Sequence, residues 1–339
     1  MELDALIADP ALGSLLDLAS AAAGGAAIAV TDADGQLLAG GSPAAGGQSL
    51  PVCVDDKAIG HVVCDASTPP AVAGLVHAAL ELAIAGSRDD VTQARAAQEL
   101  AIGRQIQRSL LPRSFPEVPG WRFAAEYEPA REVGGDLYDV YRLGGDSADV
   151  VVLLIADVTG KGVPAALLMA DTKALLRAAA DHAPGPADAL ARVNRILALE
   201  RRSSLFVTAA LAEVDVWTGG VRLASAGHES PLVVRTDGRV ETISASGFIL
   251  GAVGDAGYEE GSGSIGPGEA VLLYTDGVTE ARNPQGAFYG DTRLRALLGG
   301  LAGSAADDVR RAVVEDVGEF RAGADAHDDL TILVAERED

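Results

Sequence analysis

Short apolar runs separated by polar turns recur through the last two-thirds of this chain, and they predict strands. The predicted strands cover residues 121–128, 139–142, 150–156, 204–215, 220–226, 232–235, 270–274 and 330–335. Longer segments with apolar residues at three- and four-residue steps predict helices at 163–180, 186–201, 291–298 and 304–320. Hairpin turns join several strands and strict strand–helix alternation is absent. The pattern therefore favours an α+β fold in which helices cover packed antiparallel sheets.

Residues 1–68 have the pattern of a small separate module. A helix is predicted at 6–22, and two hairpins follow, with arms at 26–31 and 36–39 and then at 50–54 and 61–64. The turn Asp32-Ala-Asp-Gly35 has the Asp-Gly chemistry of a hairpin. This order of elements resembles a small GAF- or PAS-like sensor module. A structural dimerisation module without a ligand has the same order, and both interpretations stay open.

A helical pattern covers residues 69–112 and separates this module from a larger domain at 113–339. It forms one helix or two, with a break near Gly86. Apolar residues such as Val91, Ile102 and Ile106 share one face. The segment is either a helix that forms a homodimer or a helix that packs on the next domain.

Composition narrows the classes of function. The chain has 339 residues, 48% of them apolar, and a formal net charge of −23. Such a charge repels phosphate backbones, so nucleic acid is not an expected partner. The first residues lack a basic segment of the kind that begins a secretory signal, and the apolar stretch at 71–85 is too short to span a bilayer. We therefore expect a cytoplasmic protein without membrane contact. Cys53 and Cys64 are expected to be buried free thiols, with a disulfide between neighbouring strands as the alternative.

Four short acidic segments carry the candidate chemistry: Glu132-Val-Gly-Gly-Asp136, Asp157-Val-Thr-Gly-Lys-Gly162, Tyr274-Thr-Asp-Gly277 and His327-Asp-Asp-Leu-Thr331. Three of them place carboxylates beside a predicted strand, because Asp157 and Asp276 follow apolar runs and Asp328 precedes one. Carboxylates that meet at strand ends repel one another unless a cation lies between them. Oxygen ligands of this kind hold hard divalent ions. The pattern predicts a site for one or two Mg²⁺ or Mn²⁺ ions.

These segments, with Arg108-Ser-Leu-Leu-Pro112 and Ser225-Ala-Gly-His228, resemble the PP2C-type metal-dependent protein phosphatases, and specifically their bacterial SpoIIE- and RsbU-like branch. They occur in the order of that family from about residue 102 to residue 334. The resemblance implies a four-layer αββα sandwich, which agrees with the predicted hairpins and helices.

The resemblance also implies roles for single residues. Asp157 matches the carboxylate that bridges two metal ions, and Asp136 with the backbone carbonyl of Val158 matches the ligands of one ion. Asp276 and Asp328 match the carboxylates of the other ion. Asp329 stands second to Asp328, as an additional ligand or as a residue that supports the ligands.

The implied reaction is the attack of a metal-activated water on a phosphoserine or phosphothreonine. Arg131 is a candidate contact for the substrate phosphate, with an exposed structural arginine as the alternative, and Lys161 is a second basic candidate. The resemblance offers no histidine as general acid after Asp157, because Thr159 stands there. His228 is a near-site candidate, with a purely structural histidine as the alternative.

The expected function is therefore a Mn²⁺- or Mg²⁺-dependent serine/threonine protein phosphatase with two metal ions. By resemblance it acts in bacterial partner switching, and its substrate is a phosphorylated anti-sigma-factor antagonist of the STAS type. The competing hypothesis is a regulatory or sensor protein that uses the same fold to bind a partner with little or no catalysis.

Overall fold

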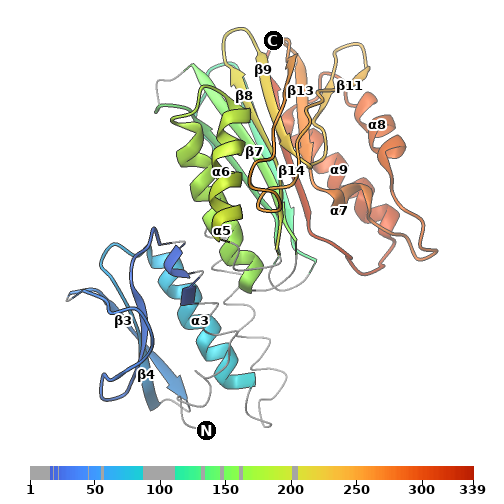
Figure 1. The fold of residues 1–339 in the computed structure, drawn as a ribbon. Helices are drawn as coiled ribbons and strands as arrows, with labels where there is room; N and C mark the ends of the chain where they lie inside the picture. The colour runs from blue at the N-terminus through green and yellow to red at the C-terminus, as the bar shows by residue number, and fades with distance from the viewer. Residues whose placement is uncertain are drawn as a thin grey trace. The chain divides into compact units, whose positions relative to one another are not determined.

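The computed structural model of this chain describes residues 16–17, 19–21, 23–44, 46–54, 57–86, 111–130, 134–145, 149–159, 163–200 and 205–339. The chain divides into two compact units, one of residues 1–110 with 161–174 and the other of residues 111–160 with 175–339 (Figure 1). The predicted helix at 6–22 and the linker beyond residue 86 lie largely or wholly outside the described residues.

The first unit contains a four-stranded antiparallel sheet and a helix. The strands are β1 Ile28–Asp32, β2 Leu37–Gly40, β3 Gln48–Val54 and β4 Lys57–Cys64, in the order β2-β1-β4-β3. Helix α3, Pro70–Gly86, packs against β3 and β4. Val30 and Val62 lie opposite each other in the register of β1 and β4 and are fully buried on the helix-covered face. The two predicted hairpins are therefore present, and the main difference is in the second, where β3 begins at Gln48 and β4 already begins at Lys57.

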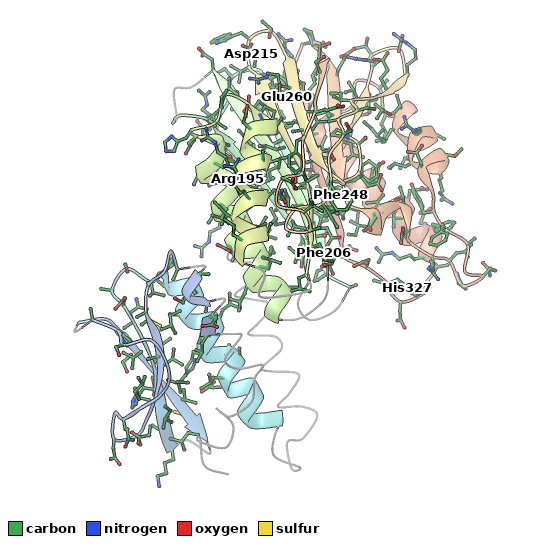
Figure 2. All side chains as sticks on the ribbon, viewed as in Figure 1. Arg195, Phe206, Asp215, Phe248, Glu260 and His327 are labelled. Carbon is green, nitrogen blue, oxygen red and sulfur yellow. The ribbon has the colours of Figure 1, made fainter. Side chains whose placement is uncertain are left out.

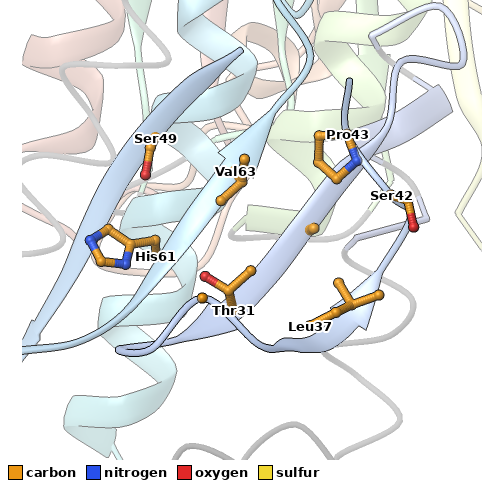
Figure 3. A pocket seen from close by; sticks show the side chains of 9 residues that line it. Thr31, Leu37, Ser42, Pro43, Ser49, His61 and Val63 are labelled. Carbon is orange, nitrogen blue, oxygen red and sulfur yellow. The ribbon is translucent and has the colours of Figure 1, made fainter. Parts of the chain in front are cut away.

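The opposite face of this sheet carries a cavity of about 390 Å³ (Figure 3). Its lining includes Thr31, Leu37, His61 and Val63, which alternate with the buried residues along the strands. The thiol expectation holds for one cysteine only, since Cys64 is buried and Cys53 is exposed.

The second unit is built on two five-stranded antiparallel sheets. One has the order β11-β10-β13-β14-β5 and the other β12-β9-β8-β7-β6. Their bounds are β5 Trp121–Glu128, β6 Leu137–Arg142, β7 Val150–Val158, β8 Val207–Asp215, β9 Gly220–Ala226, β10 Leu232–Val234, β11 Val240–Thr242, β12 Glu260–Ser264, β13 Glu269–Tyr274 and β14 Leu330–Arg337. Strand β7 is apolar almost throughout because both its faces are buried.

The helices that follow β7 in the chain are α5 Val163–Ala180, which is divided between the two units, and α6 Pro186–Glu200, α7 Asp276–Thr279, α8 Asp291–Gly299 and α9 Ala306–Arg321. Helix α6 packs on β8 and β9, while α9 packs on β5 and β14 (Figure 1). In α9, Val309, Val313 and Val317 recur at four-residue steps and are buried on the sheet. The predicted α+β class is confirmed for this unit.

Two short elements escaped the sequence prediction, β12 and α7, and the turn at 235–239 predicted the strand β11 that follows it without giving its bounds. Strand β12 reads Glu260-Gly-Ser-Gly-Ser264, and its residues are half-buried or exposed. A run of small polar residues gives no strand signal, so it becomes a strand only by pairing with β9 at the edge of the sheet. Along the described part of the chain, none of the helices combines the length and the apolar character that crossing a membrane requires.

Candidate metal centre

Carboxylates from both sheets meet at one end of the second unit. Asp157 lies at the end of β7, and Asp136 immediately precedes β6, which pairs with β7 through Leu137 and Ala156. Asp276 follows β13 and Asp328 precedes β14, and these two strands pair through Tyr274 and Ile332. Antiparallel neighbours bring the end of one strand beside the start of the next. The topology therefore gathers acids that lie far apart in the sequence.

Asp136 is anchored across the two sheets. Its side chain is 2% exposed, and its Oδ2 accepts hydrogen bonds from the hydroxyls of Thr275 at 2.8 Å and Thr331 at 2.5 Å. Both threonines are fully buried and belong to the opposite sheet or its end. Both threonines lie within the acidic segments of the sequence, but no role was predicted for them. A threonine next to an acid at the end of a buried strand is the signal that could have found them.

Asp329 fixes the loop that carries Asp136. Its Oδ1 accepts a hydrogen bond from the backbone N–H of Ala130 at 2.8 Å, and its Oδ2 accepts one from Gly135 at 2.6 Å. The N–H of Asp329 in turn donates to Oδ1 of Asp328 at 3.0 Å. Asp329 thus holds the backbone on both sides of the segment 131–133. That segment, which begins with Arg131, lies outside the described residues.

Glycines allow these segments to approach one another. A Cβ at Gly135 would overlap the carbonyl oxygen of Val158, whose N–H donates to the Gly135 carbonyl at 3.3 Å. A Cβ at Gly277 would overlap the carbonyl oxygen of Asp329. The carbonyl of Val158 therefore lies beside the Asp136 loop because no side chain separates the two backbones.

Comparisons with known proteins agree on one family. The sequence model of the SpoIIE family, stage II sporulation protein E, matches residues 147–338. The chain belongs to the SpoIIE family. It is 30% identical over 266 residues to protein IcfG of Synechocystis sp., covering 70% of this chain and 41% of the relative. It is 28% identical over 240 residues to phosphoserine phosphatase RsbU of Bacillus subtilis, covering 70% of each.

A solved structure agrees with the SpoIIE assignment. The SiaA-PP2C domain of Pseudomonas aeruginosa matches with a TM-score of 0.62 and 26% identity, covering 73% of this chain and 98% of that domain. The phosphatase fold expected from the motifs is thus the fold of this SpoIIE-family chain. The chain matches well under half of IcfG but more than two-thirds of RsbU and nearly all of the SiaA domain.

The gathered carboxylates of this SpoIIE-family chain raise one another's pKa. Burial, followed by the charges of Asp276 and Asp328, raises the pKa of Asp157 from 3.8 to about 7. Burial and Asp328 raise the pKa of Asp276 to about 6. Burial, with Asp157 and Asp329, also raises the pKa of Asp136 well above its usual value. The anionic forms therefore repel one another, and a cation among them would relieve that repulsion.

The donor chemistry fits hard divalent cations, since the cluster consists of carboxylates and a backbone carbonyl. Within the described ranges, however, no three histidine, cysteine, aspartate or glutamate side chains form a ready-made metal site. Oδ2 of Asp136 accepts hydrogen bonds from two hydroxyls. The residues that gather here thus have the ligand atoms that hard divalent ions prefer.

His228 lies beside the carboxylates rather than among them. A ring nitrogen, Nδ1, is 2.7 Å from the hydroxyl of Thr208, and Thr208 pairs with Asp157 in the register of β7 and β8. Burial lowers the pKa of His228 to about 4, so the ring is neutral at pH 7. A neutral imidazole is a poor proton donor at that pH. Lys161 and Arg131 fall outside the described residues, so their roles stay predictions.

The pKa of Asp157 predicts how the stability of the metal-free protein changes with pH. Between about pH 4 and pH 7 the folded protein holds a proton that the unfolded chain releases, so this contribution is complete at low pH and lost as the pH rises through about 7. We expect the melting temperature of chelator-treated protein to fall over this range. Thermal denaturation followed by circular dichroism measures the fall.

A matched variant separates this effect from the general acidity of the chain, which also opposes folding at high pH. Asp157→Asn removes the titrating group and keeps the shape of the side chain. We expect a smaller fall in melting temperature for the variant than for the wild type. An equal fall in both proteins would contradict the role given to Asp157.

Proposed function

We propose that this protein is a metal-dependent phosphatase that hydrolyses phosphoserine or phosphothreonine on a protein substrate. The observation that carries the proposal is the gathering of carboxylates from both sheets, with mutually raised pKa values, at one end of the sandwich. The name of the relative RsbU, a phosphoserine phosphatase, supports the choice of substrate chemistry.

We propose that Asp136, Asp157, Asp276, Asp328 and the carbonyl of Val158 hold two Mn²⁺ or Mg²⁺ ions, with Asp329 as a further ligand or as the residue that holds the Asp136 loop. The ions supply Lewis-acid activation of water and of the phosphate ester when bound. The protein itself fixes Asp136 through Thr275 and Thr331 and keeps its backbone near Val158 through Gly135. Arg131 is the proposed contact for the substrate phosphate.

The proposed setting is bacterial partner switching in the cytoplasm, with a phosphorylated STAS-type protein as substrate. The resemblance of the motifs and the relationship to RsbU support this choice. We also propose that the first unit is a regulatory, sensor-like module. The cavity on the face of its sheet opposite α3, lined by Thr31, Leu37, His61 and Val63, supports that role. The linker at 69–112 is the proposed contact of a homodimer.

Phosphate release with added Mn²⁺ tests the proposal. We expect the wild type to hydrolyse p-nitrophenyl phosphate and a phosphoserine peptide, and we expect a chelator to abolish both activities. The variant Asp276→Asn removes one proposed ligand and should lower kcat/KM on the order of a hundredfold for both substrates. A wild type that takes up Mn²⁺ but hydrolyses neither substrate would favour the competing hypothesis of a partner-binding regulatory protein.

A further inference from the structure

Large apolar side chains are exposed on α6 and on the loop that follows β11. The described part of the chain has seven exposed large apolar side chains, and four of them come from the end of α6 and the loop that follows β11. These four, which we call the apolar rim, are Ile196, Leu199, Phe248 and Val253. Leu199 is 80% exposed and Phe248 is 53% exposed. The loop lies against α6 between these positions, because a Cβ at Gly251 would meet Leu197 and a Cβ at Gly254 would meet Ala198.

Hydrogen bonds hold the loop that carries Phe248 and Val253 in place. The side chain of Asn194 on α6 donates to the carbonyl of Val253 at 2.7 Å and accepts from the N–H of Gly251 at 2.9 Å. Leu250 exchanges two backbone hydrogen bonds with Val207 at the start of β8. The loop is therefore held to both a helix and a strand while Phe248 and Val253 stay exposed.

The loop that carries Phe248 pairs with β8 at the carboxylate end of the second unit. Leu250 pairs with Val207, and Val207 pairs with Val158, the residue after Asp157. Each of these two pairings spans one spacing between neighbouring strands, so Leu250 lies about 10 Å from the end of β7.

Phe206 precedes Val207 and lies at the same end of the second unit as Asp157. Its N–H donates to the hydroxyl of Thr159 at 2.8 Å, and the N–H of Thr159 donates to its carbonyl at 2.9 Å. Figure 2 shows Phe206 at the same end of the unit as His327 and opposite to Asp215, with Phe248 nearer to Phe206 than to Asp215.

We propose that the apolar rim, with Phe248 as its main contact, binds apolar side chains of the protein substrate that flank its phosphorylated residue. The inference rests on the proposed function and adds a preference for the sequence around the phosphate. A polypeptide that brings a phosphate to Asp157 lies within about 10 Å of the loop that carries Phe248, so flanking side chains reach the rim. Contacts made equally in the bound and transition states lower KM and leave kcat unchanged.

Two phosphoserine peptides test this preference. They differ only in that leucines on both sides of the phosphoserine are replaced by serines. We expect wild-type kcat/KM to be about tenfold higher for the leucine peptide, because its KM is lower. A tenfold ratio is the discrimination that one apolar contact typically provides. The variants Phe248→Ala and Leu199→Ser should reduce this ratio, with Phe248→Ala reducing it to about twofold or less. Both should hydrolyse p-nitrophenyl phosphate, which cannot reach the rim, at the wild-type rate.

The matched control is Trp217→Ala. Trp217 is 69% exposed and follows Asp215, which pairs with Val150 at the far end of β7 from Asp157. We expect Trp217→Ala to keep the wild-type preference.

An equal rate on both peptides in the wild type, or an unchanged preference in Phe248→Ala, overturns the inference while the phosphatase proposal stands. A change only in oligomeric state, measured by light scattering, also overturns it and assigns the rim to contacts between copies. Absence of hydrolysis of every substrate overturns the phosphatase proposal itself.

Discussion

The variant Asp157→Asn is expected to lower kcat/KM for p-nitrophenyl phosphate by about a thousandfold and, in the absence of metal, to raise the melting temperature at neutral pH. The loss of activity and the gain in stability have one cause. Asp157 is the acid whose pKa is raised by both Asp276 and Asp328, in addition to its burial. Its negative charge repels its neighbours when no cation is present, and the same charge is the proposed attraction for the ions.

Metal titration separates the two effects. Saturating Mn²⁺ should raise the melting temperature of the wild type, because a ligand that binds only the folded state stabilises that state. At a Mn²⁺ concentration of a hundred times the Kd, the free energy of unfolding increases by about 3 kcal/mol. The same addition should have little effect on Asp157→Asn. Isothermal titration calorimetry and thermal denaturation at pH 7 measure the uptake and the shift.

A buried acid with a different environment serves as control. Asp139 is 2% exposed and forms an ion pair with Arg177 at 3.3 Å. Asp139→Asn removes an attraction instead of a repulsion, so it should lower the melting temperature of the metal-free protein. If Asp157→Asn lowers that temperature as much as Asp139→Asn does, the repulsion assigned to the carboxylate cluster is wrong.

The variant Gly277→Ala is expected to destabilise the protein by about 3 kcal/mol, or about 10 °C in melting temperature. A Cβ at this position would overlap the carbonyl group of Asp329 and also crowd the N–H of Leu330. The backbone must move to relieve that overlap, and Asp276 is the preceding residue. We therefore expect activity to fall together with stability, measured by thermal denaturation and by phosphate release with Mn²⁺.

Gly318→Ala is the matched control. Gly318 lies on the exposed side of α9, and no other atoms lie within 4 Å of the place where its Cβ would be. Alanine favours a helix over glycine by about 1 kcal/mol, so this variant should be slightly more stable than the wild type and fully active. Equal stability of the two variants would contradict the predicted overlap between a Cβ at Gly277 and the carbonyl of Asp329.

Local patterns in the sequence were sufficient for the main strands and helices. Strand β7 is an uninterrupted apolar run because it is buried on both faces, and α9 repeats valines at four-residue steps because one face is buried. The position of Asp157, Asp276 and Asp328 next to strands follows from these runs. The family could be predicted as well, because its motifs lie within continuous short segments, and the comparisons confirm it.

Other features depend on contacts between distant segments and have no local signal. Strand β12 forms from glycine and serine only because β9 offers it an edge. The pairing of Asp136 with Thr275 and Thr331 joins residues separated by 139 and 195 positions. The exposure of Phe248 depends on how Asn194 and Val207 hold its loop, since sequence alone would assign a phenylalanine to the core.

The amino-acid order by itself determined where the strands end and that acids stand at those ends, because apolar periodicity is a property of neighbouring residues. Only the tertiary structure decided which acids repel one another, which hydroxyls hold Asp136 and which apolar side chains remain outside. Those outcomes depend on the packing of one sheet against the other and of a loop against α6 and β8, and distances across such packing are set by the whole fold.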